Sequence, residues 1–93
     1  MTRDEVYEIL DGEREYQERE MADPTRKDMV TDFDMSKALL AIHYTLDKAV
    51  KAWYNESPEL GYDGTSEYLR KIGGIVVQMG ELYGMPERTT KKS

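Results

Sequence analysis

The sequence has no cysteine and only one histidine, His43, among its 93 residues. Disulfide bridges, thiolate metal sites and cysteine nucleophiles are therefore excluded, as is a histidine-rich zinc site. We expect no metal site and no cofactor from this inventory. No apolar run approaches the roughly 20 residues that span a bilayer, and the stretch MTRDEVYEIL at the start contains no apolar signal region. The sequence predicts a protein of the cytoplasm with no membrane partner.

Positive charge is scarce as well. The chain has 13 Lys and Arg against 19 Asp and Glu, which gives a net charge of −6. Proteins that bind DNA or RNA obtain much of their affinity by neutralising phosphates with basic residues. General nucleic-acid binding is therefore not expected. Tyrosine, in contrast, is frequent, with seven residues, and aromatic rings serve either packing or stacking on nucleotide bases.

What is present is the pattern of an all-α protein with three helices in a single domain, residues 1–93. Thr2-Arg3-Asp4-Glu5 fits a helix capping box, and the later segments show the spacing of amphipathic helices. The helices are expected at about residues 3–21, 34–54 and 66–83. We predict a short first helix packed on a longer antiparallel hairpin. A chain of this size buries a modest core, so a homo-oligomer is expected.

The second and third predicted helices carry most of the apolar residues. In the second helix one stripe has helical spacing and comprises Met35, Leu39, Ile42, His43, Leu46, Val50 and Trp53. In the third helix a flank of mostly small residues includes Gly73, Val77 and Gly80. A glycine inside a helix costs about 0.8–1 kcal/mol relative to alanine, so another element must approach closely there. Three explanations stay open: a helix of the same chain packs on this flank, the flank is an oligomer interface, or a ligand lies against it.

Two polar residues, Glu13 and Gln17, interrupt the apolar stripe of the first helix. Burying such groups without a partner costs several kcal/mol, so each must find one. A buried ion pair or hydrogen bond is one explanation, with Arg70 as the candidate partner of Glu13. A polar pocket between helices is the other.

Arg70 and Lys71 stand in the first half of the third helix, away from the C-terminal end that the helix dipole makes favourable for cations. They are either a solvated surface pair or part of an anion site, because guanidinium groups bind phosphate through charge-assisted hydrogen bonds. Arg26 and Lys27, in the first connection, would add positive charge to such a site. The predicted ligand-binding residues are Tyr7, Glu13, Tyr16, Gln17, Arg26, Lys27, Arg70 and Lys71.

His43 and Asp47 lie one helical turn apart, and such a pair can orient an imidazole for acid–base chemistry. A satisfied core histidine explains His43 more simply. The sequence places no serine or cysteine nucleophile beside the pair. No catalytic residue is assigned.

The stretch ILDGEREYQ, followed by two helices, resembles the small helical MazG-like proteins of phages. Their first helix carries an E-R-x-x-Q signature, which Glu13, Arg14 and Gln17 match. The resemblance implies a nucleoside triphosphate pyrophosphohydrolase that binds magnesium through an E-E-x-x-E motif and a later E-x-x-D motif.

Those two motifs are poorly kept in this sequence. The first would fall near His43, Tyr44 and Asp47, and the second near Glu67, Arg70 and Lys71. Only Asp47 and Glu67 retain a carboxylate, and cations at the other positions would repel Mg²⁺. Magnesium-dependent catalysis is therefore not expected, whereas direct phosphate binding by Arg and Lys is compatible with the substitutions.

In size, helix layout and residue inventory the chain is also similar to the phage anti-CBASS sponge proteins. These assemble into oligomers and sequester cyclic oligonucleotide signals. The resemblance implies that tyrosines stack on bases and that Lys and Arg contact phosphates. The sequence is therefore interpreted as a non-catalytic oligomeric protein that sequesters a phosphorylated nucleotide, in the host cytoplasm if it is encoded by a phage.

Two alternatives stay open. The chain could be an adaptor or inhibitor that binds a basic protein through its acidic first helix, with Glu13, Glu15, Glu18 and Glu20 as the charged residues. It could also be a MazG-like pyrophosphohydrolase with a degenerate metal site.

Overall fold

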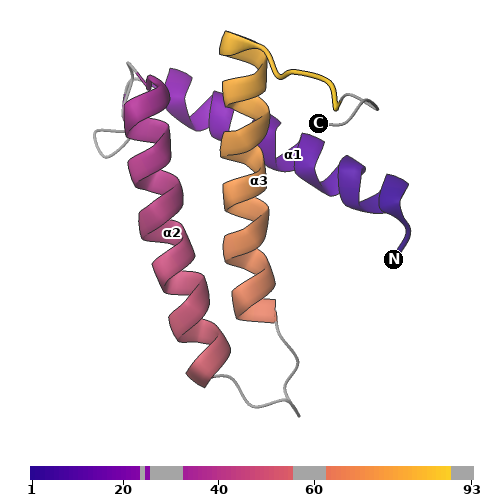
Figure 1. The fold of residues 1–93 in the computed structure, drawn as a ribbon, viewed down its shortest axis with the longest axis vertical. Helices are drawn as coiled ribbons and strands as arrows, with labels where there is room; N and C mark the ends of the chain where they lie inside the picture. The colour runs from indigo at the N-terminus through magenta and orange to yellow at the C-terminus, as the bar shows by residue number, and fades with distance from the viewer. Residues whose placement is uncertain (24, 26–32, 56–62, 89–93) are drawn as a thin grey trace.

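In a computed structural model the chain forms three α-helices and, within the described residues 1–23, 25, 33–55 and 63–88, no strand. The helices are α1 (Arg3–Ala22), α2 (Met35–Asn55) and α3 (Asp63–Tyr83) (Figure 1). The predicted all-α class is confirmed. The predicted short first helix is wrong, because α1 has 20 residues and α2 and α3 have 21 each. The helix α3 also begins before residue 66, with Asp63 in a first turn where an acidic side chain suits the helix dipole.

Side-chain caps start α1 and α2. The Thr2 hydroxyl accepts a hydrogen bond from the Glu5 amide at 3.2 Å, and the Glu5 carboxylate accepts one from the Thr2 amide at 2.9 Å. This is the predicted capping box, and its hydrogen bonds hold the pKa of Glu5 below the ordinary value. Asp34 caps α2 by accepting from the Lys37 amide at 3.0 Å and the Ser36 hydroxyl at 2.9 Å, which lowers the pKa of Asp34.

The end of α3 is set by Gly84, which adopts a φ of 80°. Its amide donates to the carbonyl oxygen of Gly80 at 2.9 Å and so satisfies one of the last free carbonyls of the helix. A residue with a Cβ atom is strained at this φ, so glycine is the residue that suits the position. The predicted end of the third helix is confirmed.

The helix α3 is the central element of the fold. It runs antiparallel to α2 at its side, and α1 crosses it at a steep angle (Figure 1). Within the described residues α1 contacts α3 but not α2. The two contacts of α3 therefore define two separate interfaces inside the chain.

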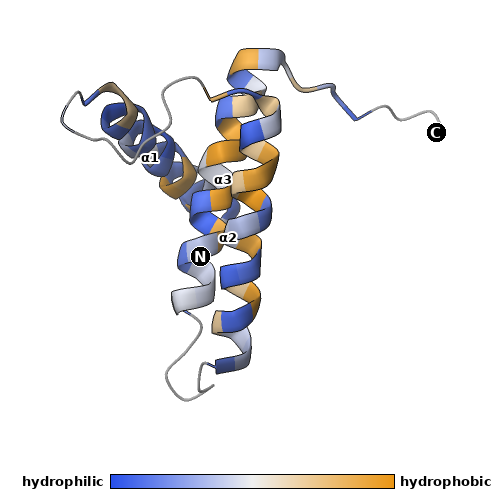
Figure 2. Cartoon of the chain, turned by 90° about the vertical axis from the view of Figure 1, so that its left-hand side faces the viewer, coloured by the Kyte–Doolittle hydropathy of each residue, from blue (hydrophilic) through white to orange (hydrophobic). Residues whose placement is uncertain are grey.

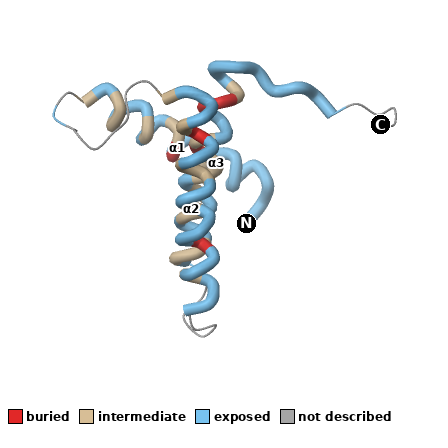
Figure 3. Tube along the Cα trace, turned by 60° about the vertical axis from the view of Figure 1, so that its left-hand side comes forward, coloured by how far each residue is buried: buried red, intermediate tan, exposed pale blue. Residues whose placement is uncertain are grey.

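The buried apolar core is small. It consists of Ala38, Ala49 and Met79, and no large side chain among the described residues is fully buried (Figure 3). The helix α2 thus turns alanines toward α3. Most members of the predicted apolar stripe of α2 are exposed, including Met35, Leu46 and Trp53, so this stripe is not the face that packs on α3. None of the described helices has the combination of length and apolar character that crossing a membrane demands.

Candidate functional site

The crossing of α1 and α3 contains a buried carboxylate with two partners. The Oε1 atom of Glu13 accepts a hydrogen bond from Arg70 Nε at 2.8 Å, and its Oε2 accepts one from Gln17 Nε2 at 3.1 Å. The Glu13 side chain is 7% exposed, whereas that of Arg70 is 38% exposed. The predicted ion pair between these two residues is confirmed. Both of its carboxylate oxygens accept hydrogen bonds, so the buried charge of Glu13 is not left unpaired where α1 docks on α3.

Gln17 continues this polar contact onto the backbone of α3. Its Nε2 also donates to the carbonyl oxygen of Lys71 at 3.2 Å, and its Oε1 is buried without a hydrogen-bond partner. The amide lies against Gly74, where a Cβ atom would stand 2.7 Å from Oε1. At the preceding residue, Gly73, a Cβ atom would overlap Leu10 Cδ2. The adjacent glycines therefore allow the close approach of α1.

Arg14, the second residue of the E-R-x-x-Q motif, also binds α3. Its Nε donates to Glu81 Oε1, and its Nη1 lies 3.9 Å from a carboxylate oxygen of Glu18. The Arg14 side chain is largely buried, and its Nη1 has no hydrogen-bond partner. All three motif residues hold α1 on α3. The sequence did not indicate the Arg14 contact, because its partner lies 67 residues away.

The predicted interface flank of α3 is partly covered by its own chain. Leu10 covers Gly73, and the side chain of Met85 lies 3.5 Å from the place of a Cβ atom at Gly80. Val77 is exposed at the edge. Close packing within the chain therefore explains the two glycines. An oligomer contact through Gly73, Val77 and Gly80 stays a prediction.

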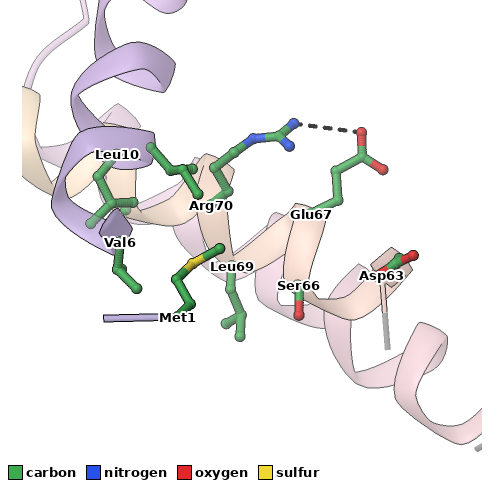
Figure 4. A pocket seen from close by; sticks show the side chains of 10 residues that line it. Met1, Val6, Leu10, Asp63, Ser66, Glu67, Leu69 and Arg70 are labelled. Atoms are coloured by element: carbon green, nitrogen blue, oxygen red, sulfur yellow. Dashed lines mark ion pairs between the residues drawn. The ribbon is translucent and has the colours of Figure 1, made fainter. Parts of the chain in front are cut away.

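Beside the ion pair lies a groove of about 810 Å³ between the first halves of α1 and α3 (Figure 4). Its apolar lining includes Val6, Leu10 and Leu69, and Arg70 stands on its polar side. A second carboxylate, Glu67 Oε1, lies 3.6 Å from Arg70 Nη2. The full lining comprises Met1, Val6, Ile9, Leu10, Asp63, Ser66, Glu67, Leu69, Arg70 and Gly73.

The other predicted ligand residues do not join Arg70 in this groove. Lys71 is exposed, with its Nζ 5.5 Å from the ring centre of Tyr68. Tyr7 and Tyr16 are exposed and stand nine residues apart, which places them on opposite sides of α1. Arg26 and Lys27 lie outside the described residues. A single chain thus brings together the side chains of Glu13, Gln17 and Arg70 but not those of the tyrosines or Lys71.

The sequence favoured His43 as a core histidine over an acid–base pair with Asp47, and the core prediction is wrong. His43 is exposed, and Asp47 pairs with Lys51 Nζ at 3.0 Å. The described residues contain no group of three His, Cys, Asp or Glu side chains placed to hold a metal ion.

The outward side of α1 is acidic. Five exposed carboxylates at intervals of three and four residues form an acidic stripe, namely Asp4, Glu8, Asp11, Glu15 and Glu18. Among the described residues, the one ion pair that this stripe makes is the long contact between Glu18 and Arg14, at 3.9 Å. Glu13 and Glu20, expected on this surface, differ from the stripe: Glu13 is buried and Glu20 is partly buried.

Comparison with known proteins adds no assignment. The chain matches no protein-family model, no curated protein and no solved structure. A proposed function must therefore rest on the geometry of the site and on the resemblances of the sequence.

Proposed function

We propose that the protein is a non-catalytic, homo-oligomeric binding protein that sequesters a phosphorylated nucleotide. The observation that carries the proposal is the way Arg70 is held. A buried carboxylate fixes its Nε, while the guanidinium remains partly exposed beside a groove. A guanidinium has five N–H donors, so the bond to Glu13 leaves donors for a phosphate. An arginine anchored in this way loses less side-chain freedom when it binds an anion.

The contact of Arg70 with Glu67 does not close the site. The two groups are 3.6 Å apart and the Glu67 side chain is 53% exposed. Exposed ion pairs contribute little stability, typically about 0.2–1 kcal/mol. A dianionic phosphate can therefore displace the Glu67 carboxylate from Arg70.

The groove next to Arg70 suits the remaining part of a nucleotide. Its volume of about 810 Å³ lies within the range of about 300–1,000 Å³ that is usual for small-molecule sites. Apolar side chains such as Val6, Ile9 and Leu69 offer a surface on which a base can lie. Tyr7 and Tyr16 do not line this groove, so base stacking on them would require a second protomer.

The most specific version of the proposal is a phage protein that sequesters a cyclic oligonucleotide defence signal. It is supported by the resemblance to phage sponge proteins in size, layout and residue types. The ligand class proposed from the geometry alone is wider: a nucleotide with at least one phosphate.

Thermal unfolding with a panel of nucleotides, in the absence of magnesium, tests the proposal. A bound nucleotide raises the melting temperature by mass action. The panel contains nucleoside mono-, di- and triphosphates and cyclic di- and trinucleotides. A melting temperature that stays constant across this panel would contradict nucleotide sequestration.

A matched pair of variants separates a specific site from general charge effects. Glu67→Gln removes the carboxylate that competes for Arg70, whereas Glu8→Gln removes the same charge from the acidic stripe. We expect Glu67→Gln to lower the dissociation constant of the best nucleotide severalfold and Glu8→Gln to leave it nearly unchanged. Equal affinities in the two variants would show that Arg70 does not bind the phosphate.

The acidic stripe of α1 favours a second candidate function, an adaptor or inhibitor of a basic protein. Like charges at these intervals repel one another and destabilise a helix slightly, so their grouping calls for an explanation outside the helix itself. The acidic stripe would attract a protein with a basic surface. Binding between the two should weaken as the salt concentration rises, because salt screens the charges. The affinity of an oligolysine probe for the protein tests this function. An equal affinity for the unchanged protein and for the double variant Asp11→Asn, Glu15→Gln would argue against it.

A further inference from the structure

Each helix of the hairpin carries two neighbouring rows of residues at alternating intervals of four and three. We define the inner rows as those at the α2–α3 contact. The inner row of α2 comprises Ala38, Ile42, Thr45, Ala49 and Ala52. The inner row of α3 comprises Tyr68, Ile72, Ile75, Met79 and Leu82. The three buried apolar residues of the chain all belong to these inner rows.

The outer rows begin one residue later in each helix. In α2 the outer row comprises Leu39, His43, Leu46, Val50 and Trp53. In α3 it comprises Leu69, Gly73, Val76, Gly80 and Tyr83. Alternating intervals of four and three are the spacing of helices that pack lengthwise against other helices. A helix with two such rows can pack on two neighbours, and the α2–α3 contact uses only the inner row of each helix.

Both outer rows face the same side of the hairpin. One residue along an α-helix corresponds to a rotation of about 100°. Because α2 and α3 run in opposite directions, this step turns both outer rows toward the same side. Figure 2 shows apolar residues in a band along the hairpin, while α1 is mostly hydrophilic. Half or so of each large side chain in the α2 row is exposed, for example 47% of Leu46 and 51% of Trp53.

The chain exposes more surface than a compact monomer of its mass. Its accessible surface is 7536 Å², compared with about 5,500 Å² expected for a folded monomer of 10.8 kDa. A stable interface buries about 800 Å² on each partner. The exposed side chains of the outer rows, among them Leu39, Leu46 and Trp53, supply apolar area toward such an interface.

The composition of the outer rows indicates which partner fits. Their ten positions contain no Asp, Glu, Lys or Arg, so charge offers no means of attracting a basic or acidic protein. His43 is the polar side chain near the middle of the α2 row, a place where a polar residue sets the register of paired helices. Every copy of the chain presents the same face, and two such faces pair about a two-fold axis in a closed assembly.

Leu10 lies over Gly73, Met85 lies beside Gly80, and Leu69 borders the groove, so Val76 and Tyr83 are the open members of the α3 row. We propose that the outer row of α2, together with Val76 and Tyr83, binds the same residues of a second copy of this chain, so that two hairpins form a four-helix core. The large residues of the α2 rows, Leu39, Leu46 and Trp53, supply the apolar surface that the alanine-lined inner contact lacks. This self-association would form the homo-oligomer of the proposed function. It does not require a ligand, so it remains valid even if the protein binds no nucleotide.

Sedimentation velocity of the full chain without nucleotide tests this proposal. We expect the unchanged protein to sediment as a dimer or larger assembly at micromolar concentration. Leu46→Glu places a charge in the outer row and should raise the dissociation constant at least about tenfold. The matched control is Leu40→Glu, in the same helix, because Leu40 is 72% exposed and lies outside both rows. The control should keep the mass of the unchanged protein.

Trp53, the single tryptophan of the chain, gives a second measurement that needs no substitution. Its fluorescence emission should shift to longer wavelength on dilution, at the concentration where the mass falls to that of a monomer. Circular dichroism at each step checks that the helices persist. A monomeric unchanged protein, equal masses for Leu46→Glu and Leu40→Glu, or an emission that dilution does not alter would each overturn the proposal. If Leu46→Glu loses its helices, the dilution series on the unchanged protein decides alone.

Discussion

The two contacts of α3 differ in chemistry and in completeness. The contact with α1 is polar and specific, with Glu13, Gln17 and Arg14 each bonded to a particular group of α3 or of one another. The contact with α2 is apolar and lined by small residues such as Ala38 and Ala49. The polar contact is nearly closed within one chain, whereas the apolar hairpin leaves its larger residues exposed. A single chain therefore fixes the crossing of α1 on α3 through polar contacts, but it does not bury the large apolar residues of its hairpin.

The largest effect is expected from breaking the ion pair of the polar contact. Arg70→Ala leaves the buried carboxylate of Glu13 without its cation and should lower the free energy of unfolding by about 3 kcal/mol. Lys71→Ala, at the neighbouring exposed position, should change it by less than about 0.5 kcal/mol. Urea unfolding at one fixed protein concentration measures both. Similar values for the two variants would show that the ion pair does not stabilise the α1–α3 contact.

The next effect concerns the apolar contact. Ala38 is 0% exposed, so the larger side chain in Ala38→Leu must push α2 away from α3. We expect a loss of about 1–3 kcal/mol in the free energy of unfolding, the usual range for overpacked sites. Ala22→Leu, at an exposed position near the end of α1, serves as the control and should be nearly neutral. An unaffected Ala38→Leu variant would mean that the hairpin contact is loose.

Alanine substitutions at two glycines should change the stability of the protein in opposite directions. A Cβ atom at Gly74 would stand 2.7 Å from the amide of Gln17, and Gly12 has nothing within 4 Å of that position. Gly74→Ala should therefore destabilise the protein by about 1–2 kcal/mol through displacement of Gln17. Gly12→Ala should stabilise it by about 0.5–1 kcal/mol, because alanine is the better helix former. Thermal melts of the two variants that shift in the same direction would contradict this account of the crossing.

The smallest effect is a pH dependence at the start of α2. The hydrogen bonds from the Lys37 amide and the Ser36 hydroxyl lower the pKa of Asp34 in the folded state. The stabilisation is therefore present above the ordinary pKa of an aspartate and is lost as the pH falls through the lowered value. Asp34→Asn should show a smaller loss of stability between neutral pH and pH about 3 than the unchanged protein. Parallel pH profiles for both proteins would exclude this contribution.

Part of the candidate site was predictable. The sequence identified Glu13 and Gln17 as polar residues in an apolar stripe that needed partners, and it named Arg70 as the partner of Glu13. It did not reveal the partner of Arg14 or the close contact between Gln17 and Gly74. Those features depend on the place where α1 crosses α3. The spacing of residues within one helix does not contain that place, because it depends on which turns of the two helices meet.

Sequence by itself determined three helix ends of this protein, because each depends on groups only a few residues apart: the capping box of Thr2 and Glu5, the cap at Asp34 and the left-handed Gly84. The start of α3, at Asp63 and not at residue 66, was not among them. The sequence also determined that α2 and α3 would be amphipathic. Only the tertiary structure decided which of two neighbouring rows in each helix would face the partner helix. The inner row of α2 can approach α3 closely because its residues are small, and this choice leaves the larger outer row exposed.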